Sequence, residues 1–170
     1  MKVAVIGAST ADELSTAIAE KVGRLIAERG WHLLCGGGGG VMEAACRGFC
    51  AVPADVRGMT VGILPSDTAE FANYFVELTL PTGLGFARNA MIVQAADGII
   101  AVGGCAGTLS ELAYAWQFEK PVAAMSASGG WSARLAGERL DERFPSPIFA
   151  ATSAEAAAEY LTSVFVKTAR

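Results

Sequence analysis

The chain has 170 residues, 52% of them hydrophobic and only 18% charged, which is enough apolar material for one well-packed domain. With 13 basic and 17 acidic side chains the formal net charge is −4, and no basic stretch offers a surface to nucleic acid. The apolar start at Val3–Ile6 is too short for a signal-peptide core, and no apolar run is long enough to span a bilayer. We therefore expect a cytoplasmic protein without a nucleic-acid or membrane partner.

The four cysteines do not predict a metal site. Cys46 and Cys50 are spaced to share one helix face, but the chain has only one histidine, His32, to add to them. We therefore expect no metal, and we interpret all the cysteines, Cys35 and Cys105 included, as small apolar residues buried in a protein of a reducing compartment.

Apolar runs that are typical of strands alternate along the chain with segments of helical spacing. In chain order, the predicted strands are Lys2–Gly7, Trp31–Cys35, Thr60–Leu64, Phe75–Leu80, Gly98–Val102, Pro121–Met125 and Pro147–Ala150. The predicted helices run from a Thr10 cap to Gly30, then over Val41–Cys50, Leu84–Ala96, Leu109–Phe118 and Thr152–Lys167, with a loop and a short helix within Ser126–Phe144.

Several of these strands are apolar on both faces, which is typical of a parallel sheet covered on both sides. We therefore predict an α/β fold: a doubly wound, mainly parallel sheet with helices on both faces, forming a single domain over residues 1–170. Ligands of such folds bind beyond the carboxyl ends of the strands. A binding site is expected at that edge.

Two glycine-rich turns, Gly36–Gly40 and Gly103–Thr108, each follow a strand and precede a helix. Backbone N–H groups at such a turn lie at the positive end of the helix dipole, where a phosphate binds readily. Glycines can also mark tight packing of a strand on a helix, but five in succession exceed what packing needs. The predicted phosphate-binding residues are Gly36, Gly37, Gly38, Gly39, Gly40, Gly103, Gly104, Cys105, Ala106, Gly107 and Thr108.

The common nucleotide-binding fingerprints do not match these turns. The dinucleotide pattern G-x-G-x-x-G fails after Gly36, because Val41 stands where its last glycine would fall, and Gly7–Thr10 does not match it either. There is no Walker motif. These mismatches disfavour a nicotinamide or flavin dinucleotide, and they disfavour ATP held by a phosphate-binding loop.

Two charged residues stand out near the second turn. Glu111 follows Thr108 with the spacing of a helix capping box, and the same spacing recurs at Thr10–Glu13 and Thr152–Glu155, where we expect no chemistry. The neighbouring glycines distinguish Glu111, which would lie one helical turn from a bound ligand. Arg88 lies in an otherwise apolar helix that we expect to be buried, so it needs either a structural carboxylate or a ligand phosphate as partner.

Four motifs together carry a resemblance to a known family. They are the opening Val3–Ser9, the G-G-G-x-x-V-M-E pattern ending at Glu43, the segment Gly85–Asn89, and Gly103-Gly104 followed by Gly107-Thr108-x-x-Glu111. Their order and spacing resemble the Lonely Guy (LOG) superfamily, formerly termed lysine decarboxylase-like, and most closely its branch of molybdenum cofactor carrier proteins. The resemblance covers most of the chain.

The resemblance implies a Rossmann-like fold, a homo-oligomer (dimer or tetramer) and a phosphate site at the glycine turns. In the phosphoribohydrolase members an arginine and a glutamate of these motifs serve hydrolysis of nucleoside 5′-monophosphates, and Arg88 and Glu111 match them as catalytic candidates. Gly7, Ser9 and Asn89 are candidate additional ligand contacts.

Three positions depart from the phosphoribohydrolase pattern P-G-G-x-G-T-x-x-E with its upstream Arg-Lys pair. Gly103 stands at the proline, Cys105 at a loop glycine, and Asn89 at the lysine. These departures favour the carrier branch. We therefore expect a binding protein for a phosphorylated small molecule, either a nucleotide or the molybdenum cofactor pterin, with no required cofactor beyond that carried ligand; the alternative is a nucleoside 5′-monophosphate phosphoribohydrolase.

Overall fold

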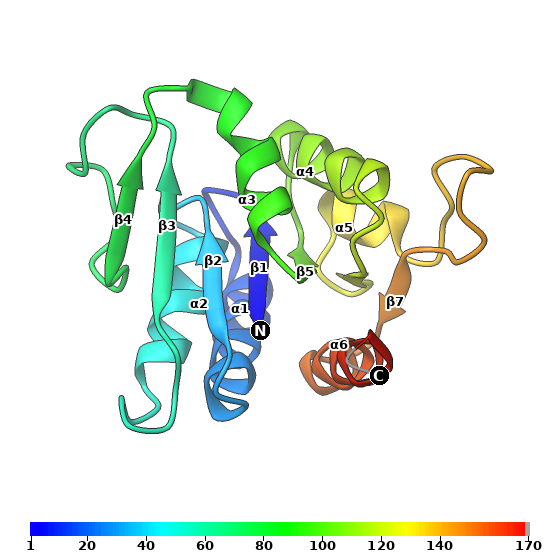
Figure 1. Ribbon diagram of the computed structural model, residues 1–170, viewed down its shortest axis with the longest axis horizontal. Coiled ribbons are helices and arrows are strands. Elements are labelled where there is room, and N and C mark those ends of the chain that lie inside the picture. The colour runs from blue at the N-terminus through cyan, green and yellow to red at the C-terminus, as the bar shows by residue number, and fades with distance from the viewer. Residues whose placement is uncertain (169–170) are drawn as a thin grey trace.

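A computed structural model describes residues 1–168 of the chain. Its centre is one seven-stranded sheet in the order β4-β3-β2-β1-β5-β6-β7, and every neighbouring pair of strands is parallel (Figure 1). The strands are β1 Lys2–Gly7, β2 His32–Cys35, β3 Thr60–Leu64, β4 Leu78–Pro81, β5 Gly98–Val102, β6 Val122–Met125 and β7 Phe149–Ala151. This is the predicted doubly wound α/β fold, and the sheet is parallel throughout.

Helices cover both faces of this sheet (Figure 1). They are α1 Glu13–Glu28, α2 Val41–Cys50, the 3₁₀ helix η1 Gly85–Arg88, α3 Asn89–Ala95, α4 Ala106–Gln117, α5 Gly130–Leu135 and α6 Ala154–Thr168. Alternate residues of β1 face opposite sides: Val3 and Val5 pack with α1, α2 and α6, whereas Ala4 and Ile6 pack with α3 and α4. Burial on both faces explains why the central strands are apolar at every position.

The strand order reverses beside β1, and this positions the candidate site. From β1 the chain winds outward through β2 to β4, then returns to the other side of β1 with β5. Gly7 and Val102 end these two neighbouring strands in register. A crevice opens outside the carboxyl ends of strands where the winding direction changes, and both glycine turns begin there.

Helix starts differ from the sequence predictions in the choice of cap. Asp12, not Thr10, caps α1: its carboxylate accepts from the Ser15 amide at 2.7 Å. In α6 the hydroxyl of Ser153, rather than Thr152, accepts from a first-turn amide. Each wrong prediction chose a polar residue one or two places too early, because several capping residues stand in succession and geometry selects the one whose side chain reaches the orphan amide.

Helix α4 begins three residues earlier than predicted, at Ala106. Cys105 is its N-cap and makes no side-chain capping hydrogen bond. Thr108 therefore lies inside the first turn, and the Thr108–Glu111 spacing is not a capping box. The structure therefore excludes helix capping as the reason for this spacing.

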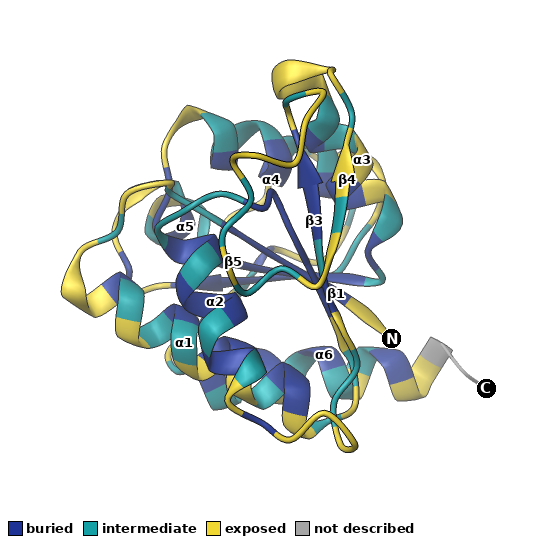
Figure 2. Ribbon diagram, turned by 90° about the vertical axis from the view of Figure 1, so that its left-hand side faces the viewer, coloured by how far each residue is buried: buried dark blue, intermediate teal, exposed yellow. Residues whose placement is uncertain are grey.

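The predicted buried helix Leu84–Ala96 is wrong in its first half. That half is the 3₁₀ helix η1, and its surroundings are open: Leu84 is 52% exposed and Phe86 84% exposed, while β4 beside it is the exposed edge of the sheet (Figure 2). Only α3 lies over the sheet, where Ile92 and Val93 are buried. Within residues 1–168 no helix has the length and apolar character needed to cross a membrane.

Candidate functional site

A cavity of about 170 Å³ lies at the carboxyl edge of the sheet, at the point where the winding reverses. Nine of the residues singled out in the sequence line it: Gly7, Ser9, Gly36, Arg88, Asn89, Cys105, Gly107, Thr108 and Glu111. Gly37–Gly40, Gly103, Gly104 and Ala106 do not line it. The two glycine turns therefore meet at one cavity, but each contributes only part of its length.

Most of the first turn is committed to packing. The Gly37 carbonyl accepts from the backbone and side-chain amides of Asn73, at 2.8 and 3.2 Å, and the Gly38 carbonyl accepts from the same side chain at 2.9 Å. Gly40 has φ +62°, and a Cβ there would lie 2.5 Å from the carbonyl oxygen of Ala8. These glycines hold the turn against its neighbours and leave Gly36 facing the cavity.

The second turn is anchored on one side and open on the other. The Gly103 amide donates to the Ser128 hydroxyl at 2.7 Å, and its carbonyl accepts from the Ser132 amide at 2.9 Å. Beyond this anchor α4 starts without a side-chain cap, so its first amides have no acceptor within the helix. A Cβ at Gly107 would meet nothing within 4 Å. The positive end of the α4 dipole therefore faces the cavity, and no side chain within residues 1–168 covers the backbone at Gly107.

Arg88 and Glu111 form a buried ion pair in this cavity. Nη1 of Arg88 lies 3.3 Å from Oε1 of Glu111, and the two side chains are 11% and 8% exposed. The pair is 23 residues apart in sequence and depends on α3 packing beside α4. The structure thus supplies the partner that the sequence analysis required for Arg88.

A chain of hydrogen bonds aims the guanidinium of Arg88. Nη1 donates to the side-chain oxygen of Asn89 at 2.6 Å, and the Asn89 amide donates to the Ser110 hydroxyl at 2.7 Å. On the other side Arg88 lies against Gly36, where a Cβ would be 2.9 Å from Cζ of the guanidinium. Asn89, predicted as a ligand contact, is 3% exposed, and its side-chain oxygen accepts from Arg88 while its amide nitrogen donates to Ser110.

The guanidinium is nevertheless incompletely satisfied. Among the described residues, Nε of Arg88 is the one buried side-chain nitrogen or oxygen without a hydrogen-bond partner. A buried donor left unpaired costs about 1–3 kcal/mol, so such groups call for an explanation. Because Arg88 lines the cavity, an anionic ligand bound there would lie against this guanidinium.

Glu111 has an unusual acidity for a carboxyl group. Burial raises its pKa to about 7, although the Arg88 guanidinium opposes the shift. Near neutral pH the side chain can therefore either accept or donate a proton. Perturbed groups of this kind concentrate at functional sites.

A family model described as the SLOG cluster4 family matches residues 1–158 of the chain. The chain belongs to this family. Two solved structures are similar over almost the whole chain. The molybdenum cofactor binding protein of Rippkaea orientalis is 34% identical with a TM-score of 0.83, covering 96% of each chain. The molybdenum cofactor carrier protein of Chlamydomonas reinhardtii is 26% identical with a TM-score of 0.76, covering 97% of this chain and 98% of that one.

A relative with a different described activity also matches this SLOG cluster4 member. The cytokinin riboside 5′-monophosphate phosphoribohydrolase of Mycobacterium tuberculosis is 33% identical over 102 residues. The match covers 58% of this chain and 52% of that protein, so it spans about half of the enzyme. These findings place the chain in the LOG-like superfamily, near the molybdenum cofactor carrier branch, as its motifs predicted.

Sequence reasoning missed part of this family member's cavity. Val5, Ile6, Ala8, Met42 and Phe86 also line it. The signal for Met42 and Phe86 was their place inside two of the recognised motifs, next to Gly36–Gly40 and Arg88. The cysteine prediction fails at Cys105, which is exposed, but Cys35 and Cys46 are buried.

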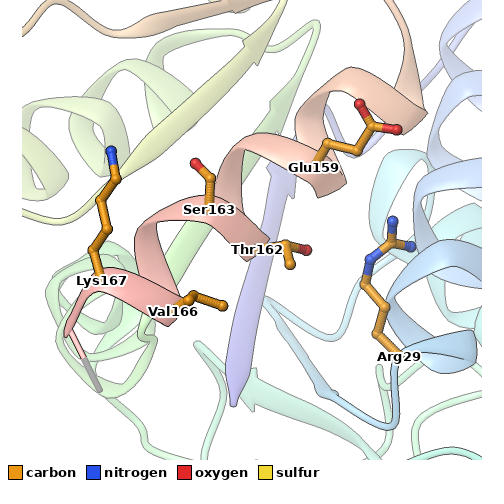
Figure 3. Close-up of a pocket in the computed structure, with 6 residues that line it drawn as sticks. All are labelled: Arg29, Glu159, Thr162, Ser163, Val166 and Lys167. Carbon is orange, nitrogen blue, oxygen red and sulfur yellow. The ribbon is translucent and has the colours of Figure 1, made fainter. Parts of the chain in front are cut away.

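A larger hollow of about 470 Å³ lies on the far side of the protein, between α6 and the end of α1 (Figure 3). Three of its polar side chains donate to carbonyls of their own segments: Arg29 to Leu25, Thr162 to Ala158 and Ser163 to Tyr160. None of the predicted site residues lines it. Size alone does not make it a candidate site.

Proposed function

We propose that this protein binds a phosphorylated small molecule, either a nucleotide or the pterin of the molybdenum cofactor, and acts as a carrier. The observation that carries the proposal is the buried Arg88 guanidinium, with Nε unpaired, in a cavity that the start of α4 also faces. A guanidinium fork and unpaired helix amides are the donors that phosphate prefers. The names of the Rippkaea and Chlamydomonas proteins support the pterin as one candidate.

The position of Glu111 favours binding over turnover. Hydrolysis of an N-glycosidic bond requires a carboxylate that reaches water beside the sugar. The Glu111 side chain is 8% exposed and is occupied by Arg88 at 3.3 Å. A carrier has no need for a free carboxylate, so a Glu111 that is paired with Arg88 fits retention of an intact ligand.

A second candidate function is hydrolysis of nucleoside 5′-monophosphates. The observation in its favour is the pKa of about 7 for Glu111, which suits a general base near neutral pH. In this reaction water adds to C1′ of the ribose and gives a proton to Glu111, while the N-glycosidic bond breaks and the base leaves with the bonding electrons. The departing base takes up a proton from solvent, and Glu111 releases its proton to solvent. Arg88 would hold the phosphate. The products are the free base and ribose 5-phosphate.

The same proposal includes a cytoplasmic homo-oligomer. Two exposed apolar side chains, Leu84 just before η1 at 52% and Met91 on α3 at 45%, are candidates for the surface between copies. Light scattering at two protein concentrations would measure the mass. A mass equal to one chain at both concentrations would contradict this part.

One experiment separates the two functions. Purified protein is analysed by native mass spectrometry for a retained ligand, then incubated with AMP while adenine and ribose 5-phosphate are measured. A carrier retains or binds a phosphorylated molecule and releases no adenine. Adenine release that disappears in Glu111→Gln but persists in Glu70→Gln, an exposed glutamate, would establish the hydrolase instead.

A further inference from the structure

Phe86 is an exposed aromatic residue at the cavity that holds Arg88. We propose that Phe86 is the stacking platform for a planar heteroaromatic ring carried by the phosphorylated ligand. The inference rests on the proposed function and adds the part of the ligand that the cavity does not hold. It assigns recognition of the ring to a residue outside the Arg88–Glu111 pair.

The size of the cavity is the first observation. Ligand pockets usually enclose about 300–1,000 Å³, whereas this cavity encloses about 170 Å³. Its polar groups, Arg88 and the start of α4, account for the phosphate end of a ligand. The rest of a nucleotide or pterin must therefore extend out of the cavity opening, over a residue at its edge.

The second observation is the state of Phe86 itself. The residue lines the cavity and yet is 84% exposed. Within residues 1–168 no ring–ring or cation–π contact involves it. An exposed phenylalanine beside the Arg88 cavity offers a ring face without a hydrogen-bonding demand, which is the chemistry that stacks on a flat heteroaromatic ring.

The backbone under Phe86 is held firmly, so the platform is in place before a ligand arrives. Just before it, the Thr82 amide and hydroxyl donate to the Leu64 carbonyl, at 3.2 and 2.7 Å. The Gly83 amide donates to Ser66 and the Gly85 amide to Pro65, both at 2.9 Å. Because these bonds tie η1 to the end of β3, stacking requires little ordering of the chain.

Phe86 and Arg88 both line this cavity, so one bound molecule can contact the two residues. A phosphate at Arg88 leaves the sugar or linker to cross the mouth, and the ring then reaches Phe86. This connection favours a ligand ring over a second copy of the chain as the occupant of this surface. The ring can belong to a nucleobase or to a pterin, since both are flat and nitrogen-rich.

The test compares ligands with and without a ring. AMP, GMP (whose guanine shares the aminopyrimidinone ring of a pterin) and ribose 5-phosphate are titrated by calorimetry into wild type, Phe86→Ala, Phe86→Leu and Phe86→Trp. Tyr74→Ala removes another exposed ring, 93% exposed, that does not line the cavity, and is the matched control. We expect Phe86→Ala and Phe86→Leu to weaken a ring-bearing ligand about tenfold. Phe86→Trp and the control should bind as wild type does, and ribose 5-phosphate affinity should not change.

Other outcomes overturn the inference in distinguishable ways. Equal losses for ribose 5-phosphate and the nucleotides, or no loss for any of them, would remove Phe86 as a ring platform while leaving phosphate binding intact. A lower mass of Phe86→Ala in light scattering would assign Phe86 to a subunit interface. If wild type binds none of AMP, GMP and ribose 5-phosphate, both the phosphate site and the inference are refuted. A preference for GMP over AMP would indicate recognition of the aminopyrimidinone ring, which guanine and pterin share.

Discussion

The protein contains two arginine–glutamate pairs that differ in how well they are satisfied. Glu77 accepts from both terminal nitrogens of Arg57, at 2.8 and 2.9 Å, and from the Thr60 amide at 3.0 Å. Glu111 is more deeply buried but receives a single bond, from Arg88 at 3.3 Å. The hydrogen bonds from Arg57 lower the pKa of the Glu77 carboxyl, whereas burial raises the pKa of the Glu111 carboxyl to about 7.

The two ion pairs differ in how many of their hydrogen-bonding groups have partners. In the Arg57–Glu77 pair the donors and acceptors are matched, so nothing is left for a ligand. In the Arg88–Glu111 pair a buried nitrogen lacks an acceptor and a buried carboxyl is thinly supported. The second pair is poor at stabilising the fold, and that weakness is what a ligand phosphate would relieve.

The largest expected effect is on the pH dependence of stability, tested with Glu111→Gln. The pKa of Glu111 is about 7 in the folded state against about 4.5 when unfolded, so the folded state binds more protons between these values. Wild type should therefore lose about 3 kcal/mol of unfolding free energy, from this group, as pH rises from 4.5 to 7. Urea unfolding across this range should show the difference between wild type and variant. A difference that is constant with pH would mean that Glu111 does not titrate there.

The next effect concerns ligand affinity and Arg88. Because a hydrogen bond to a charged group contributes about 1.5–3 kcal/mol, Arg88→Ala should weaken binding of AMP or inorganic phosphate by roughly ten- to a hundredfold. Arg88→Lys should recover part of that loss, since it keeps the charge without the fork. Calorimetric titration measures both variants. Arg57→Ala is the control, and it should change stability without changing affinity.

A smaller loss of affinity is expected for Gly36→Ala. The added methyl would lie 2.9 Å from both Cζ of Arg88 and Sδ of Met42, so the guanidinium must shift away from its aimed position. We expect about a tenfold loss of phosphate affinity, roughly 1.4 kcal/mol. Gly107→Ala adds the same methyl where nothing lies within 4 Å and should fold normally. If Gly36→Ala binds phosphate as wild type does, Arg88 is not held by that contact.

The smallest expected effect is the loss of stability when the Arg57–Glu77 pair is broken. Glu77→Gln should lower the unfolding free energy by about 1 kcal/mol at pH 7, a value discounted because Glu77 is 38% exposed. The pKa of Glu77 is lowered in the folded state, so its contribution is present at neutral pH and is lost as pH falls through the folded pKa. Its pH dependence is thus opposite in sign to that of Glu111. Urea unfolding measures it, and unchanged phosphate affinity in this variant completes the contrast.

Central elements were predicted from the sequence more accurately than edge elements. The predicted bounds of β1, β3, β5 and α2 match the observed ones. The three strands are mostly buried, which gives them a nearly continuous apolar pattern. The predicted strand Phe75–Leu80 instead became β4 at Leu78–Pro81. Its first residues are drawn out of the strand: the Phe75 carbonyl accepts from the Thr60 hydroxyl at 2.7 Å, and Glu77 pairs with Arg57.

The candidate site was predicted in its chemistry and missed in its shape. Arg88 and Glu111 were noticed because a charge in an apolar helix and a carboxyl behind a glycine turn are rare, and they meet in the structure. Phe86 was predicted to be buried, since its segment is apolar. Only the fold shows that η1 extends past the sheet and leaves this ring exposed beside the cavity.

The sequence by itself determined the layered α/β architecture, because the alternation of apolar strands and helical spacing leaves few ways to bury the apolar faces. The positions of the glycines also determined where a ligand could approach the backbone closely. Tertiary structure decided which arginine found a complete set of partners and which did not. That outcome depends on how many donors and acceptors distant segments bring within about 3 Å, and local sequence does not encode such a count.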